Sequence, residues 1–402
     1  MHAESLRKET NDWLATNWSG KKTPDFVERV IDAKLAAPSW PVEWHGRGVS
    51  PDVSQVVAQE FAKVGAPGAG QDVTNLWANT VLAFGTNELR SEHLRDLMLG
   101  NTNMCLLYSE PGAGSDLAGL QTRAERDGDE WIINGQKVWT SMGRNADYAF
   151  LIARTDWDVP KHAGISFFFL PMKQPGVEVR ALRQATGDSR FNEVFLTDAR
   201  VSNANMLGDL GKGWSVLQTA LAYERAVMGE SYRRRKDASA ESAVRKAGDE
   251  ADAPLPDLSL LDLARDTGRI DDLVVRQQLM SLHSLVQVNK WNGARSKAEL
   301  EQGTSSSIVS LGKLAMSRIL HTAGSLQAEI LGAEAMIAGS DSPRSADATY
   351  SMLNAFFTSI GGGTDQIQRN IIGERVLGLP REPEPDKGVP FSQVRKATVT
   401  PG

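Results

Sequence analysis

A segment from Tyr108 to Asp116 combines the residue types that can hold an anionic or a flat ligand. It reads Tyr-Ser-Glu-Pro-Gly-Ala-Gly-Ser-Asp, with hydroxyls on both sides of three small residues. Because glycine lacks a side chain, backbone amides in such a loop can closely approach a phosphate or an aromatic ring. Composition alone leaves a second interpretation open, namely an ordinary glycine-rich turn before a strand.

Two shorter segments place polar groups at the ends of predicted elements. Trp139-Thr140-Ser141 lies at the end of a predicted strand. These residues could form a ligand-binding surface from an aromatic ring and two hydroxyls, or they could be a core tryptophan followed by surface hydroxyls. Gly361-Gly-Gly-Thr364 precedes a predicted helix for which Thr364 is a natural N-cap. Open amides there could hold a polarised carbonyl or a phosphate, or the glycines could form a flexible turn between helices.

Glu224 is the strongest candidate for a general base. It falls on an apolar stripe at the spacing of an amphipathic helix, which comprises Leu217, Ala220, Leu221 and Met228. A carboxylate on that face should be partly desolvated, which raises its pKa toward the working range of a general base. The alternatives are a glutamate that extends to a domain edge and one that pairs with Arg225.

Metal and nucleic-acid sites find little support in the sequence. The six histidines lack metal-ligand spacing, and the single cysteine, Cys105, rules out an intrachain disulfide and a thiolate zinc cluster. With 44 basic and 50 acidic side chains the net charge is -6, so no excess positive field favours nucleic acid. The basic run Arg233–Lys236 is either a solvated face or a clamp on phosphates of a nucleotide-bearing ligand.

Length and composition indicate a globular protein of several domains. The chain has 402 residues, which at roughly 150 residues per domain predicts two or three domains. Hydrophobic residues make up 41% and charged residues 23%, which excludes global disorder. No apolar run reaches the length of a signal peptide or of a membrane span. We therefore expect a soluble, cytoplasmic protein without membrane association.

The elements that must position these residues follow one another in three layers: helices over 1–104, a β-domain over 105–212 and helices over 213–380, with a loose tail over 381–402. Ser50-Pro51 predicts a capped helix start, and Asp127-Gly128 and Asn134-Gly135 each predict a hairpin turn. Further strands are predicted at 148–154, 165–170, 177–182 and 191–197. Longer helices are predicted at 275–297, 306–337, 351–360 and 365–377.

Taken together, these segments resemble acyl-CoA dehydrogenases over nearly the whole chain. Three long stretches carry the resemblance in the family's order: Tyr108 to Asp116, Gly135-Gln-Lys-Val-Trp-Thr-Ser141 and Gly361-Gly-Gly-Thr-Asp-Gln-Ile-Gln-Arg-Asn-Ile-Ile372. The resemblance implies a mainly α fold with a central β-domain, composed of an N-terminal helical domain, a middle β-barrel and a C-terminal four-helix bundle. It also implies FAD, an acyl-CoA substrate, and an electron-transfer flavoprotein or similar electron acceptor.

The resemblance also implies roles for individual residues. Glu224-Arg225 matches the branch of the family that carries its base in an earlier helix, whereas the straight-chain enzymes carry it in the glycine turn, where this chain has Gly362. Glu224 would take the α proton, the Gly362 amide would stabilise the thioester oxygen, and Arg225 would order the substrate site. Ser115 falls on a position that touches the acyl-CoA. Flavin contacts are expected from Tyr108, Ser109, Ser115, Trp139, Thr140, Ser141, Gly332, Thr364 and Gln366.

Two departures from the family pattern concern contacts between subunits. The usual Arg-x-x-Phe-Gly segment cannot be found after Glu224, and either Arg233–Lys236 or Arg276 would have to substitute for its arginine. Ala333 follows Gly332 where a second glycine is usual. The resemblance implies a homotetramer or a heterotetramer with a related subunit. A non-catalytic or half-site subunit remains the alternative function, and an oxidase of the same fold is also compatible.

Overall fold

The computed structural model describes residues 2–223, 256–301, 308–337 and 342–394. These residues fall into two compact units. The first takes its residues from Met1–Leu182, Ser189–Ala238 and Asp386–Gly402, and the second from Arg183–Asp188 and Ser239–Pro385. Among the described residues, no helix is both long and apolar enough to cross a membrane.

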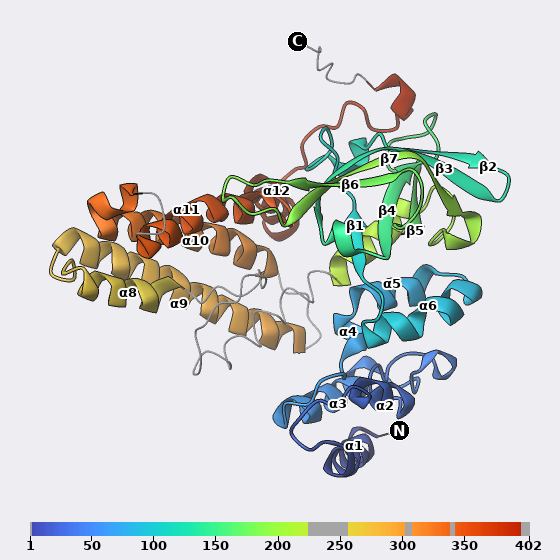
Figure 1. Cartoon of the computed structure of the whole chain (residues 1–402), viewed down its shortest axis with the longest axis horizontal. Helices are drawn as coiled ribbons and strands as arrows, with labels where there is room; N and C mark the ends of the chain where they lie inside the picture. The colour runs from blue at the N-terminus through green and yellow to red at the C-terminus, as the bar shows by residue number, and fades with distance from the viewer. Residues whose placement is uncertain (1, 224–255, 302–307, 338–341, 395–402) are drawn as a thin grey trace. The chain divides into compact units, whose positions relative to one another are not determined.

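The N-terminal part of the first unit is helical (Figure 1). A buried core of apolar side chains, including Leu6, Phe26 and Val57, joins these helices to strands of the central sheet. Pro51 opens its helix as predicted, although the Ser50 side chain makes no capping hydrogen bond. The helices are α1 (Ala3–Asn17), α2 (Phe26–Asp32), α3 (Pro51–Lys63), α4 (Gln71–Thr74), α5 (Leu76–Phe84) and α6 (Asn87–Leu99).

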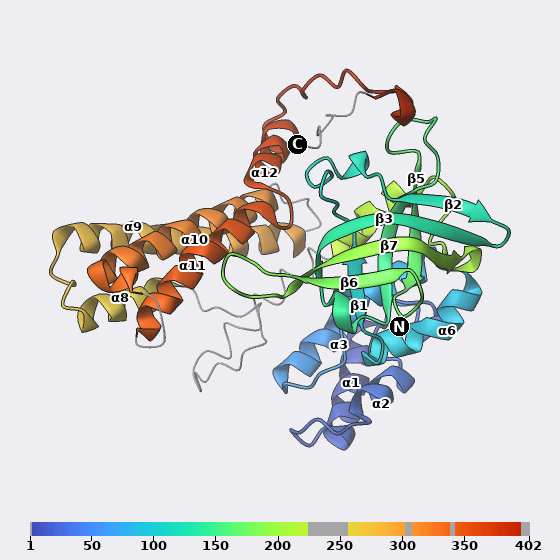
Figure 2. The same ribbon diagram turned by 45° about the horizontal axis from the view of Figure 1, so that its top comes forward.

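The centre of the first unit is a curled seven-stranded sheet. Its strands are ordered β1-β4-β2-β3-β7-β6, with β5 paired to β4, and β3 and β7 are long antiparallel neighbours (Figure 2). Phe150, Phe167 and Phe169 are fully buried, which explains the strong aromatic signal of these strands. The strands are β1 (Met104–Leu107), β2 (Arg123–Asp127), β3 (Glu130–Ser141), β4 (Tyr148–Arg154), β5 (Ile165–Pro171), β6 (Val177–Leu182) and β7 (Phe191–Ser202).

One of the two predicted hairpin turns is confirmed and the other is wrong. Asp127-Gly128 forms the turn between β2 and β3, where Gly128 has a φ of 61°. Asn134-Gly135 instead lies inside β3, at a register shift against β7. A Cβ on Gly135 would lie 2.8 Å from the Cα of Thr122, so glycine is needed there for close approach of a second segment and not for a turn.

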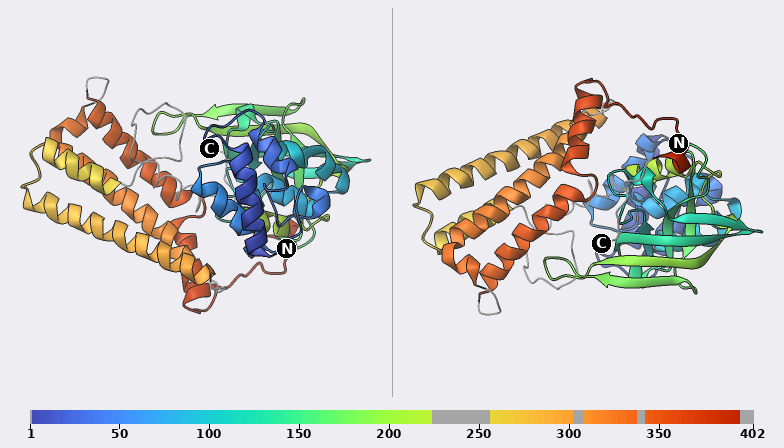
Figure 3. Two further views of the ribbon diagram at one scale, coloured as in Figure 1. Left: turned by 90° about the horizontal axis from the view of Figure 1, so that it is seen from below. Right: turned by 90° about the horizontal axis from the view of Figure 1, so that it is seen from above.

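The second unit is a helical bundle (Figure 3), in which α10 packs against both α9 and α11. Its apolar core includes Val275, Leu282, Ile319 and Ile330. The predicted helices are present, but the one predicted at 351–360 begins at Pro343 and the one predicted at 306–337 ends as an α-helix at Leu331. The helix at the start of the unit, α8, is not among the predicted elements. The helices are α8 (Pro256–Asp266), α9 (Leu273–Glu301), α10 (Val309–Leu331), α11 (Pro343–Ile360) and α12 (Asp365–Ile371), which continues as a π-helical turn, Ile372–Val376. Helices, sheet and helices thus follow in the expected order, and the predicted fold class is confirmed.

The C-terminal segment returns to the first unit, where the sequence predicted only a loose tail. Phe391 is buried, and its ring centroid lies 3.5 Å from the guanidinium carbon of Arg154. The Phe391 and Ser392 amides donate to the carbonyls of Val159, at 2.9 Å, and Trp157, at 2.7 Å. A single aromatic residue in an otherwise polar and proline-rich stretch accounts for this docking.

Candidate active site

A bulge near the end of β3 turns Trp139 out of the sheet. The register against β7 shifts between Lys137 and Thr140, and Trp139 has a φ of 64°. A left-handed backbone is rare for a bulky residue, and such strain is concentrated at functional sites. The Trp139 side chain is 56% exposed, with its ring edge-to-face against Phe191 at 5.9 Å between centroids. The bulge therefore presents a flat aromatic surface to solvent.

The loop that begins at Tyr108 runs beside this bulge. The Val138 amide donates to the Ser109 carbonyl at 2.9 Å, which places Ser109 next to the residue before Trp139. Beyond it, Glu110 and Ala113 exchange two backbone hydrogen bonds and close a tight turn at Pro111-Gly112. Gly112, Gly114 and Ser115 are exposed, so their amides and the Ser115 hydroxyl are open to a ligand.

A buried ion pair between Lys137 and Glu110 connects the beginning of this loop to β3. Lys137 is fully buried, and its Nζ donates to the Tyr108 carbonyl at 3.0 Å and to Glu110 Oε1 at 2.9 Å. The Glu110 carboxylate also accepts the amides of Gln121, at 2.7 Å, and Thr122, at 2.9 Å. Burial by itself would raise the pKa of Glu110, but the Lys137 ammonium and the donated hydrogen bonds hold it below its usual value. The carboxylate is therefore ionised at neutral pH.

Thr140 and Ser141 complete this part of the site. Thr140 is buried, and its hydroxyl donates to the Leu106 carbonyl at 3.3 Å, so the side chain joins β3 to the strand that leads into the loop. Ser141 is exposed. The first unit thus brings the loop residues Tyr108 and Ser109 together with the β3 segment Trp139-Thr140-Ser141.

The glycine turn lies in the second unit, between α11 and α12. Gly362 and Gly363 have φ of 66° and 91°, and a Cβ on Gly362 would have nothing within 4 Å. Thr364 Oγ1 accepts the Ile367 amide at 3.2 Å, which confirms the predicted N-cap. The next residue, Asp365, accepts from Ser317 at 2.8 Å and lies 3.5 Å from the Lys313 ammonium. The turn is thereby fixed to α10.

Other predicted site residues have different outcomes. Gln366 is exposed, and Gly332 ends α10 with a φ of 57° and is also exposed. The helix of residues 213–223 buries Leu217 and Ala220, in agreement with the predicted stripe. Glu224, Arg225 and the run Arg233–Lys236 lie outside the described residues.

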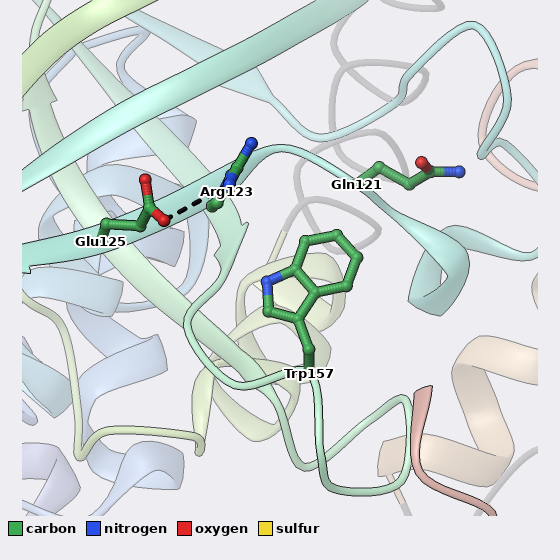
Figure 4. Close-up of a pocket in the computed structure, with 4 residues that line it drawn as sticks. All are labelled: Gln121, Arg123, Glu125 and Trp157. Atoms are coloured by element: carbon green, nitrogen blue, oxygen red, sulfur yellow. Dashed lines mark hydrogen bonds and ion pairs between the residues drawn. The ribbon is translucent and has the colours of Figure 1, made fainter. Parts of the chain in front are cut away.

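Two open cavities are lined by other residues than the predicted site residues. One, of about 500 Å³, is lined by Gln121, Arg123, Glu125 and Trp157, with Arg123 and Glu125 paired at 3.3 Å (Figure 4). The other, of about 370 Å³, lies in the bundle and is lined by Gln278, His321, Thr322, Ser325, Leu326 and Glu329. In the described part of the chain, no group of three or more histidine, cysteine or acidic side chains could hold a metal ion.

Sequence reasoning missed the buried cations that shape this region. In the sequence, Lys137 is recognisable only as part of a motif, and Arg154 only as the end of a predicted strand. Arg154 is fully buried and donates to the carbonyls of Ala118, Leu120 and Lys161 at 2.7 to 3.2 Å. Burial lowers its pKa to about 10, so it stays charged at neutral pH. A basic residue within an apolar strand was the available signal, since a buried charge needs fixed partners.

Comparison with known proteins gives consistent matches along the chain. Models of the acyl-CoA dehydrogenase N-terminal, middle and C-terminal domains match residues 2–101, 105–199 and 259–377. The acyl-CoA dehydrogenase IpdE1 of Mycobacterium tuberculosis is 33% identical, over 94% of this chain and 98% of the relative.

Solved structures give the same picture of the fold. The Tcur3481-Tcur3483 steroid ACAD has a TM-score of 0.66 at 24% identity, over 94% of this chain and 98% of that chain. The ChsE4-ChsE5 complex of Mycobacterium tuberculosis has a TM-score of 0.61 at 29% identity, again over 94% and 98% of the two chains.

Proposed function

The chain belongs to the acyl-CoA dehydrogenase family and is an oxidoreductase of that class, and from this premise we propose that it converts an acyl-CoA thioester to the trans-2-enoyl-CoA with Glu224 as the base. The observation that carries most weight is the bulge of β3, where a strained, exposed Trp139 lies beside the Tyr108–Asp116 loop. A flat aromatic surface next to open amides and hydroxyls suits a planar, polar cofactor better than a purely structural sheet edge.

The donor set fits FAD, the cofactor of this flavoprotein family. Trp139 offers a ring face, and the half-buried Ser109 and the exposed Ser141 offer hydroxyls near it. Exposed glycine amides at 112 and 114 suit the approach of a flat or anionic group. When bound, FAD would supply the acceptor for the hydride that leaves the β carbon.

In the proposed reaction, Glu224 removes the α proton of the thioester. That proton becomes acidic only when the thioester oxygen is stabilised as negative charge develops on it. We assign this stabilisation to the backbone amide of Gly362, in the glycine turn before α12. Arg225 would order the substrate site, and Ser115 would contact the acyl-CoA.

The remaining assignments concern the cofactor and the partners. Thr364, Gln366 and Gly332 would contact FAD from the second unit. Electrons would pass to an electron-transfer flavoprotein or a similar acceptor, and the chain would assemble as a homotetramer or with a related subunit.

A second candidate function is a half-site subunit of a heteromeric enzyme. Two observations favour it: the missing Arg-x-x-Phe-Gly segment, and the likeness to ChsE4-ChsE5, which is itself a complex of two different proteins. In that case a related subunit would supply the contact that this chain lacks.

The experiment is an anaerobic titration of the purified chain, alone and with any genomic neighbour, against short, long, branched and steroid CoA thioesters. With a dehydrogenase, the visible absorption band of the flavin should bleach in proportion to the amount of substrate added. Full flavin occupancy without bleaching by any thioester would contradict the proposal, and bleaching only in the presence of the neighbour would support the half-site candidate.

A further inference from the structure

The buried ion pair between Lys137 and Glu110 joins three backbone segments at one point. The whole loop is the segment Tyr108–Thr122 between β1 and β2. Glu110 lies in its first arm, and the Glu110 carboxylate accepts the amides of Gln121 and Thr122 in its second arm. Lys137 lies on β3 and donates to that carboxylate and to the Tyr108 carbonyl. The pair therefore ties both arms of the loop to the strand.

The same junction lies at the start of the β3 bulge. Lys137 is the last residue in register before Trp139 turns outward, and the next amide, that of Val138, donates to Ser109. Thr122, whose amide binds Glu110, fills the space beside Gly135 that a Cβ would occupy. The residues that surround the junction thus set the spacing between the loop and the bulge.

Resting on the proposed function, we propose that the Lys137–Glu110 pair is a positioning device that fixes the Tyr108–Thr122 loop and the β3 bulge in the arrangement that binds flavin. Neither side chain needs to touch the cofactor. Lys137 is fully buried and Glu110 nearly so, and their polar atoms are engaged with the backbone and with each other.

The chemistry of the junction explains why a neutral substitute would fail. In Glu110→Gln, an amide NH2 replaces one carboxylate oxygen, so a donor faces either a backbone amide or the Lys137 ammonium. In Lys137→Met, the carboxylate keeps two amides but loses its counter-ion in a buried site, where an unpaired charge is costly. Both variants weaken the ties between the loop and β3, although the Val138 amide still donates to the Ser109 carbonyl in each.

Glu60 provides a matched control. It is also a buried carboxylate with two cationic partners, Arg7 and Lys63, and it lies in α3, away from the loop and the bulge. Glu60→Gln should lower the melting temperature through the same loss of a buried ion pair. It should leave flavin binding unchanged.

The test compares Glu110→Gln, Lys137→Met and Glu60→Gln by four measurements: FAD affinity, kcat at saturating FAD, hydrogen exchange of residues 108–122 and the melting temperature. We expect the first two variants to weaken FAD binding by about tenfold, to lower kcat at saturating FAD and to exchange faster in the loop. Glu60→Gln should change only the melting temperature. If Lys137→Met fails to fold, Glu110→Gln decides.

Two outcomes would overturn the proposal: unchanged exchange and FAD affinity in Glu110→Gln, or the same changes in Glu60→Gln. Absence of FAD binding in the parent protein would instead contradict the proposed function. Loop exchange in Glu110→Gln would still decide whether the pair fixes the loop.

Discussion

At the scale of single residues, Glu224 carries the proposed proton transfer. We expect Glu224→Gln to keep the fold and any bound flavin but to lower kcat by at least about 100-fold, because an amide cannot take the α proton. Stopped-flow reduction of the flavin by substrate measures this. Glu374→Gln, which changes a carboxylate after α12, serves as the control and should have little effect. Turnover by Glu224→Gln within tenfold of the parent would refute the assignment of the base.

Cys105 is a residue whose chemistry the fold suppresses. Burial raises the pKa of its thiol to about 12, whereas the ordinary value is 9.0. The folded protein should therefore resist alkylation at pH 8 and react only when unfolded in urea, as mass spectrometry can check. Because the unfolded thiol ionises first as pH rises, Cys105 should lower stability between about pH 9 and 12. Cys105→Ala should remove that part of the decline. Rapid labelling of the folded protein would contradict this prediction.

At the scale of elements, the turn between α11 and α12 combines a strained backbone with an assigned role. A side chain on Gly362 would be strained at a φ of 66° and would also enter the proposed substrate site. Gly378 has a φ of 69° and equally open surroundings, so it isolates the cost of backbone strain. We expect Gly362→Leu to lower kcat/KM, and Gly378→Leu to affect only stability.

Gly362→Glu gives a sharper form of the same test. It installs a carboxylate where the straight-chain enzymes carry theirs, so it should partly restore the activity of Glu224→Gln. Activity and substrate affinity left untouched in Gly362→Leu would show that Gly362 does not line the site.

The C-terminal segment is a second element with a testable contribution. Phe391→Ala removes a buried ring that covers the Arg154 guanidinium, and we expect it to lower the free energy of unfolding by about 3 kcal/mol. Urea unfolding measures this loss. Lys387→Ala, an exposed change in the same segment, should have no measurable effect. Equal stability of Phe391→Ala and the parent would mean that the segment does not dock in solution.

At the scale of the whole molecule, we propose that the second unit associates with another chain, because several of its large apolar side chains are exposed. Exposed apolar surface is commonly covered in an interface. We expect a tetramer of identical or related subunits, with each FAD completed by a neighbouring chain. The side chains are Met352, Phe356, Phe357 and Ile360 on α11, and Leu377 and Leu379 after α12.

Native mass spectrometry distinguishes the two forms of assembly. A homotetramer should hold one FAD per chain, whereas a chain that needs a related partner should hold less than one, or none, when made alone. A stable monomer with full FAD occupancy would contradict both forms.

The sequence determined the order of the layers, most strand positions and the family, because these depend on local patterns of apolar, aromatic and glycine residues. The stripe of Leu217 and Ala220, the N-cap at Thr364 and the turn at Asp127-Gly128 are of this kind. Only the tertiary structure decided that Asn134-Gly135 is a close approach to Thr122 and that Lys137 is buried against Glu110, 27 positions away in the chain. Those outcomes depend on which distant backbone segment occupies the space beside a residue, and short-range sequence patterns contain no information about that.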